Sequence, residues 1–140
     1  MTPHGAPLRL VRPPGWPRPV GYSDGVTARG RLVCIAGQVG WDPLTQEFAT
    51  DDLAEQAAQA LRNVVAVLTA AGAEPSHLVR LVWYVTDRTV YDAAREQIGR
   101  DYRSIIGEHY PAMSLLIVAG LHERRAQVEI EATAVTPLES

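Results

Sequence analysis

Residues 126–135 read AQVEIEATAV, the clearest strand pattern in the chain. Apolar and polar side chains alternate along it, a pattern typical of a strand that buries one face and leaves the other open. The apolar positions are Val128, Ile130, Ala132 and Ala134. The polar positions between them include Glu129 and Glu131. The sequence therefore predicts a sheet with one face in a core.

Two segments upstream of this strand have the period of amphipathic helices. Asp52-Leu53-Ala54-Glu55 resembles a capping box, and the apolar stripe behind it ends at Gly72. A second stripe follows Asp87, which can cap it, and ends at Gly107. The two stripes consist of Leu53, Ala57, Leu61, Val64, Leu68 and Ala71, then Val90, Ala93, Ala94, Gln97, Ile98, Tyr102, Ile105 and Ile106.

Four further segments predict strands. Residues 78–86, LVRLVWYVT, are too short and too rich in Val and aromatic residues for a helix, so they predict a buried strand, and residues 113–119 predict another. Residues 26–28 and 32–36 predict a hairpin that closes at Gly37-Gln38, and residues 39–50 a loop.

The order of these elements is strand, strand, helix, strand, helix, strand, strand. It predicts an α+β fold, in which a mixed sheet carries both helices on one face. The second face of such a sheet is normally hidden in another subunit, so we expect an oligomer.

The first twenty residues differ in composition from the rest. Six prolines there exclude a helix, so residues 1–20 predict an extended or loosely ordered arm. The remainder, residues 21–137, has the length of one domain.

Charge and composition exclude several classes of protein. The net charge of −3 and the pI of about 5.8 leave no basic field for phosphates, so we do not expect nucleic acid as a partner. No apolar run approaches the roughly 20 residues of a membrane span, and the N-terminus lacks the core of a signal peptide. We therefore expect a cytoplasmic protein with no membrane partner.

The residues available for catalysis limit the chemistry. All 13 basic residues are arginine, which excludes Schiff-base chemistry through lysine, pyridoxal phosphate included. The four histidines lack metal-ligand spacing, so we predict neither a metal nor a cofactor. Cys34 lies in an apolar run and is expected in the core.

Short motifs in a fixed order resemble the Rid family, also called YjgF-type and formerly labelled endoribonuclease L-PSP. They are YSDGV at 22–26, IAGQV at 35–39, LRNV at 61–64, VTD at 85–87, YPA at 110–112 and VEIEA at 128–132. The resemblance covers about residues 20–136. It implies a chorismate-mutase-like subunit in a homotrimer, with sheets lining a central barrel and clefts between subunits. It also implies hydrolysis of reactive imines or enamines to keto acids and ammonia, without a cofactor.

The resemblance also implies roles for individual residues. In the family, an arginine after Pro-Ala holds the substrate carboxylate, but this chain has Met113 there and keeps the following Ser114. Glu129 matches the acidic residue beside the attacking water. Tyr22 matches the residue that closes the cleft, and Gly37 the glycine whose backbone contacts the ligand.

Arg95 stands where the family often has an asparagine that faces the cleft. If Arg95 points inward, it could supply the charge lost at Met113; if it points outward, it is one of several surface arginines. Ala36 and Leu115 replace a common serine and cysteine. His109 is either a proton-transfer group or an exposed loop residue.

Two functions from different classes remain at this stage. The first is a Rid-type imine or enamine deaminase in which Glu129 is the catalytic residue. The alternative is a non-catalytic trimer that binds or senses a small molecule, which would not need a carboxylate to orient water. A ribonuclease is disfavoured by the acidic charge balance.

Overall fold

The computed structural model describes residues 8–138, so the first seven residues of the predicted arm lie outside the described residues. The elements, in chain order, are β1 (Leu8–Val11), β2 (Gly25–Ala28), β3 (Arg31–Val39), α1 (Leu53–Ala70), a 3₁₀ turn (Pro75–His77), β4 (Leu78–Val85), α2 (Arg88–Ile105), β5 (Ala112–Ile117) and β6 (Val128–Thr136). Among these residues, no helix is both long and apolar enough to cross a membrane.

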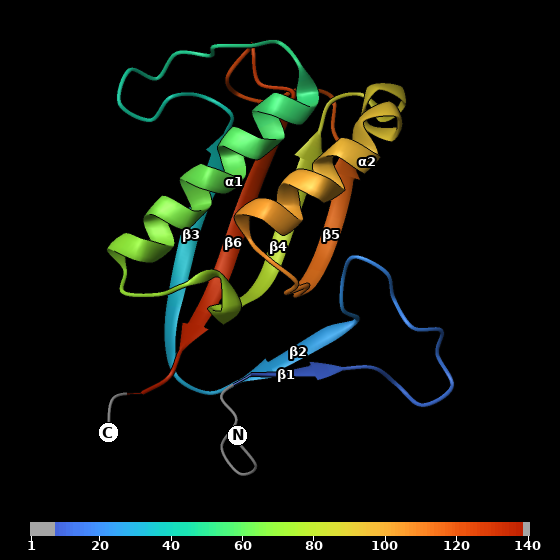
Figure 1. Ribbon diagram of the computed structural model, residues 1–140. Coiled ribbons are helices and arrows are strands. Elements are labelled where there is room, and N and C mark those ends of the chain that lie inside the picture. The colour runs from blue at the N-terminus through green and yellow to red at the C-terminus, as the bar shows by residue number, and fades with distance from the viewer. Residues whose placement is uncertain (1–7, 139–140) are drawn as a thin grey trace.

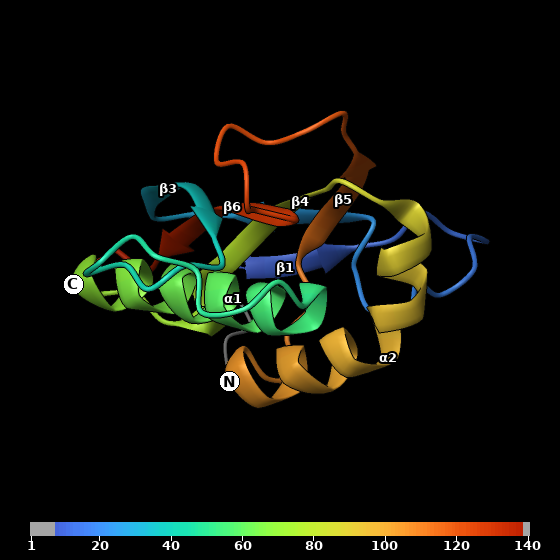
Figure 2. The same cartoon turned by 90° about the horizontal axis from the view of Figure 1, so that it is seen from above.

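The main sheet is mixed, as predicted. Its strand order is β3-β6-β4-β5, so β3 and β5 form opposite edges. β6 is antiparallel to both neighbours, whereas β4 and β5 are parallel. Figures 1 and 2 show α1 and α2 on the same face of this sheet. The prediction of an α+β fold with both helices on one face is confirmed, and we call the opposite face the open face.

Alternation along β6 places the core under the helices. Val128, Ile130, Ala132 and Ala134 are buried, while Glu129 and Glu131 are only partly buried. Most of the predicted α1 stripe is buried against them, and Asp52 caps α1 by accepting from the Glu55 backbone N–H. The cap and the apolar stripe therefore fix α1 where the sequence predicts it.

The predicted hairpin between residues 26–28 and 32–36 is wrong. β2 pairs with β1 from the arm, in a separate two-stranded sheet, and β3 pairs with β6. At the turn between β2 and β3, Gly30 has a φ of +148° and packs so closely on the Thr136 backbone that a Cβ there would overlap it. This contact aligns β3 with β6, where Val33 and Ile35 become buried under the helices.

Two predictions of burial are also wrong. Cys34 is exposed, because it alternates with the buried Val33 and Ile35 and so projects from the open face. In the predicted α2 stripe, Val90, Ala93 and Gln97 are exposed; Ile98 and Tyr102 are the buried residues of that helix. α2 covers the edge of the sheet, so only a narrow side of it reaches the core.

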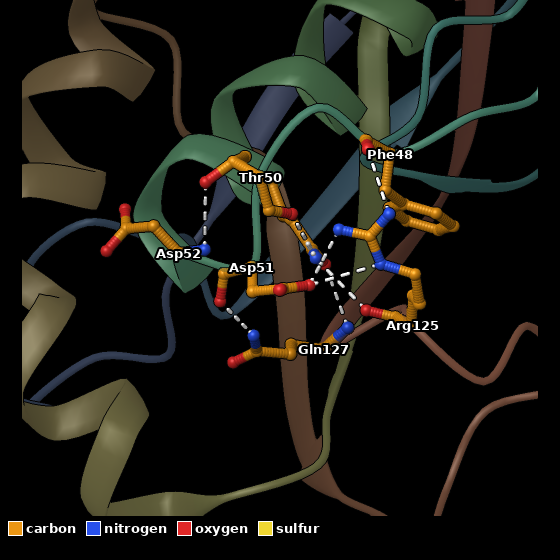
Figure 3. Close-up of polar contacts among 7 residues, drawn as sticks. Phe48, Thr50, Asp51, Asp52, Arg125 and Gln127 are labelled. Atoms are coloured by element: carbon orange, nitrogen blue, oxygen red, sulfur yellow. Dashed lines mark hydrogen bonds and ion pairs between the residues drawn. The ribbon is translucent and has the colours of Figure 1, made fainter.

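A polar network ties the loop before α1 to the loop before β6 (Figure 3). Arg125 forms an ion pair with Asp51 at 2.8 Å, donates to the Phe48 carbonyl, and stacks its guanidinium over the Phe48 ring at 5.6 Å. The Gln127 side chain donates to the Asp51 carbonyl. Beneath them, buried Gln56 donates to the backbone of both loops and accepts from the Gln127 N–H. The network holds the start of β6, and hence Glu129, in a defined register.

Candidate functional site

A cleft of about 780 Å³ opens between the arm, α2 and β5. We call it the β5–α2 cleft. It brings together Tyr22 from the segment that follows the arm, Arg95 from α2, and Met113 and Ser114 from β5. Four of the predicted site residues therefore line one cavity. Arg95 is among the lining residues of the cleft, but it is an exposed residue, so its role as a substitute for the charge lost at Met113 stays a prediction.

The arm reaches the cleft of its own chain because Ser23 attaches it to the chain around β5. The Ser23 N–H donates to the Pro111 carbonyl at 3.0 Å, and its hydroxyl donates to the Tyr110 carbonyl. Ser23 also forms a parallel bridge with Ala112, the first residue of β5. These bonds hold Tyr22 over the edge of the cleft.

The two β5 residues face different sides of the sheet. Met113 pairs with Leu81 of the core and packs partly buried against the core residues, on the helix side. Ser114 pairs with Val82, which lies on the open-face side of β4. In place of an arginine, Met113 thus gives the β5 wall of the cleft an apolar surface.

Gly37 and Glu129 meet elsewhere, on the open face. The pairing of β3 with β6 shifts register between Ile35 and Gln38, which places Gly37 in a β-bulge. A Cβ at position 37 would overlap the Glu129 carboxylate, so only glycine fits beside that side chain as it stands. Within residues 8–138, the Glu129 carboxylate has neither an ion pair nor a hydrogen-bond partner.

Glu131 is the matched contrast to Glu129 on the same strand and face. Its carboxylate accepts a hydrogen bond from the Tyr84 hydroxyl. This bond, followed by burial and by the charges of Glu131 and Glu129, raises the pKa of Tyr84 above its usual value of 10.0. The Glu131 carboxylate is thereby engaged by Tyr84, while the Glu129 carboxylate is available to bind water or a ligand.

Within one chain, the predicted site residues form two groups that lie in different places. Tyr22, Arg95, Met113 and Ser114 line the cleft beside β5, but Gly37 and Glu129 are not among its lining residues. β3 and β5 are opposite edges of the sheet, which explains the separation.

His109 lies outside the β5–α2 cleft. Its Nε2 is 2.7 Å from the Leu78 carbonyl oxygen, and the ring is partly buried. It is therefore not the exposed loop residue considered from sequence, and its role in proton transfer stays a prediction. No group of three or more His, Cys, Asp or Glu side chains in residues 8–138 is arranged to hold a metal ion.

Several lining residues were not predicted. From α2 the cleft also receives Tyr91, Tyr102 and Arg103, and from other elements Arg18, Trp83 and Tyr110. Tyr91, Arg95 and Tyr102 recur at helical spacing, so a search for polar and aromatic periodicity would have found this face of α2. Arg18 has no comparable signal, because it lies in an arm without regular period.

The chain matches a protein-family model described as Endoribonuclease L-PSP over residues 17–136. It belongs to the Rid family. Among curated relatives, it is 32% identical to a 2-iminobutanoate/2-iminopropanoate deaminase of Dermatophagoides farinae, over 93% of this chain and 98% of that protein. The human protein of the same name is 31% identical, over 81% of this chain and 79% of its own length.

Solved structures of Rid proteins share the fold. The Rid protein YyfB of Yersinia pestis, described as of unknown function, superposes with a TM-score of 0.82 at 34% identity, covering 93% of this chain and 99% of that one. TdcF of E. coli, solved with bound serine, gives a TM-score of 0.65 at 30% identity, covering 91% and 98%.

Proposed function

We propose that this Rid protein is a cofactor-independent deaminase that hydrolyses a reactive imine or enamine and works as a homotrimer. The observation that carries the proposal is the unoccupied carboxylate of Glu129, set against a bulge that has room only for glycine at position 37. Relatives of nearly the same length, named as 2-iminobutanoate/2-iminopropanoate deaminases, support the reaction class.

The chemistry requires one positioned carboxylate. Water adds to the carbon of the C=N bond while Glu129 accepts a proton from it, and the imine nitrogen gains a proton to give a carbinolamine. The C–N bond then breaks, the hydroxyl becomes a carbonyl, and its proton leaves with the nitrogen as ammonia. Because the reaction is a hydrolysis, no oxidant or reductant takes part.

The strand order supports a site shared between subunits. Glu129 and Gly37 lie toward the β3 edge, and Met113 lies on the opposite, β5 edge. In a head-to-tail ring, the β5 edge of one subunit faces the β3 edge of the next, which brings the two groups together. The open face also carries exposed Leu32 (63%) and Leu116 (43%), which a ring would cover. Native mass spectrometry should find three times the 15.3 kDa chain mass.

The test compares Glu129→Gln with Glu131→Gln. Imines are generated in situ by an amino-acid oxidase, and ammonia release is measured above spontaneous hydrolysis. We expect Glu129→Gln to lose about 10²-fold or more in rate, as for removal of a general base. Glu131→Gln, altered on the same face but bonded to Tyr84, should retain most of the activity.

Equal loss in both variants would contradict the assigned role of Glu129. An absence of turnover by the wild-type protein on every imine tested would favour the alternative, a non-catalytic small-molecule-binding trimer. Met113 is the feature consistent with that alternative, since it removes the family's carboxylate anchor.

A further inference from the structure

Within residues 8–138 of one chain, the β5–α2 cleft has a positive charge that no carboxylate of its lining neutralises. Arg18, Arg95 and Arg103 line it, and its lining includes no aspartate or glutamate. The ion pair within residues 8–138 joins Arg125 to Asp51, away from the cleft, and none of the three cleft guanidinium groups donates a hydrogen bond to a described residue. By contrast, protein acceptors receive hydrogen bonds from Arg31, Arg62, Arg100 and Arg125.

The three cleft arginines come from two walls. Arg95 and Arg103 lie eight residues apart on α2, hence on one face of the helix, and Arg18 approaches from the arm. Arginines that line a cavity without a carboxylate in its lining are suited to an anion, and to a carboxylate in particular.

The remaining surface of the cleft is aromatic and apolar. Tyr102 and Tyr110 stack with ring centroids 5.3 Å apart. The Tyr102 hydroxyl donates to the His109 carbonyl at 2.6 Å, so Tyr102 contributes its ring, and not its hydroxyl, to ligand contacts in the cleft. Burial raises the pKa of Tyr91, and the nearby charge of Arg95 opposes this effect. Trp83 adds a further buried aromatic side chain to the lining.

The volume of the cleft is also larger than a three-carbon substrate needs. About 780 Å³ lies within the roughly 300–1,000 Å³ of sites that enclose drug-sized ligands. A small imine of the alanine type would leave most of the aromatic wall uncovered.

We propose that the cleft binds 2-imino acids, and their 2-oxo products, that carry an aromatic side chain, with the carboxylate on Arg95 and Arg103 of α2. The assignment of the imino form rests on the proposed function. Relative to a strand arginine at position 113, the carboxylate anchor has moved to the helix wall, and Met113 with the tyrosines receives the aromatic group.

Calorimetry with the full chain tests the ligand class. The probes are 2-oxo-4-phenylbutanoate, pyruvate, which lacks the aromatic group, and 4-phenylbutan-2-one, which lacks the carboxylate. We expect 2-oxo-4-phenylbutanoate to bind at least about tenfold more tightly than either of the other two, because each of those loses one of the two contacts.

Variants of α2 test the anchor. Arg95→Gln and Arg103→Gln should each weaken 2-oxo-4-phenylbutanoate binding about tenfold, whereas binding of 4-phenylbutan-2-one should not change. Arg100→Gln is the matched control, since Arg100 is exposed on the same helix, bonds Gln97, and lies outside the cleft lining. Circular dichroism of each variant confirms that the fold is retained.

Two results would overturn the proposal: equal affinity for 2-oxo-4-phenylbutanoate and pyruvate, or equal losses in Arg100→Gln and Arg95→Gln. Its failure differs from failure of the proposed function. If the aromatic ligand does not bind but Glu129→Gln abolishes ammonia release from another imine, the ligand proposal is wrong and the deaminase proposal is supported. If the ligand binds through Arg95 and no imine is hydrolysed, the ligand proposal is supported and the deaminase proposal is wrong.

Discussion

Replacing Gly37 by alanine tests whether the bulge in β3 positions the Glu129 carboxylate. The new Cβ would overlap the Cγ, Cδ and Oε2 atoms of Glu129, so that side chain must adopt another rotamer. The Glu129 side chain is only partly buried and can rotate away, so the loss of folding stability should be about 1 kcal/mol, the cost of a poor rotamer. A displacement on the order of 1 Å at a reacting group can lower the rate about 10²-fold.

The expected result is therefore a large loss of turnover with a small loss of stability. Ammonia release from the best imine substrate gives the rate, and thermal unfolding gives the stability. Gly25→Ala is the control, because a Cβ at that position of β2 would lie at an ordinary 3.5 Å from the Val11 Cβ. We expect Gly25→Ala to match the wild-type protein in rate.

The double variant Gly37→Ala/Glu129→Gln shows whether Gly37→Ala acts by displacing the Glu129 carboxylate or in another way. If Gly37→Ala acts through Glu129, then adding it to Glu129→Gln should cause little further loss, since the two changes remove the same interaction. Normal turnover in Gly37→Ala, beside a large loss in Glu129→Gln, would refute the idea that the bulge sets the carboxylate. So would additive losses in the double variant.

Substitutions at Met113 and Asp52 and the reactivity of Cys34 give three other predictions. Met113→Arg should raise turnover of 2-iminopropanoate about tenfold and lower that of aromatic imines, because it restores an anchor on β5 and removes the apolar wall; paired ammonia-release assays measure both. Asp52→Ala should lower the free energy of unfolding by about 1 kcal/mol in urea denaturation, since the α1 cap to Glu55 is lost. If the protein is the proposed trimer, Cys34 should react slowly with a thiol reagent in the assembled protein and rapidly after dissociation; rapid reaction of the intact protein would argue against a covered open face.

Much of the main sheet could be predicted because its determinants are local. The alternation in β6, the cap at Asp52 and the apolar stripe of α1 each lie within one segment, and each specifies one element. The pairing of β2 could not be predicted in the same way, because its partner β1 comes from the proline-rich arm. Sequence proximity to β3 suggested a hairpin, but the close contact of Gly30 with Thr136 directs β3 to β6.

The candidate site was predictable in part for a similar reason. Resemblance to the Rid family identified Glu129, Gly37, Tyr22 and Met113 by their positions in motifs. The motifs carry no information on side chains outside them, so Arg18 and Arg103 were missed, although both line the same cleft as Arg95. Cys34 shows the opposite error: an apolar run suggested burial, but the two-residue period of the strand turns its side chain outward.

The opposite-edge positions of β3 and β5 have a consequence for mixed assemblies. In a head-to-tail ring, each site takes its Glu129 wall from one chain and its Arg95 wall from the next. If Glu129→Gln chains are co-assembled with equal amounts of Arg95→Gln/Arg103→Gln chains, about a quarter of the sites receive two intact walls by chance. Two defective proteins would thus complement each other and recover activity that neither has alone, whereas chains with self-contained sites would recover none.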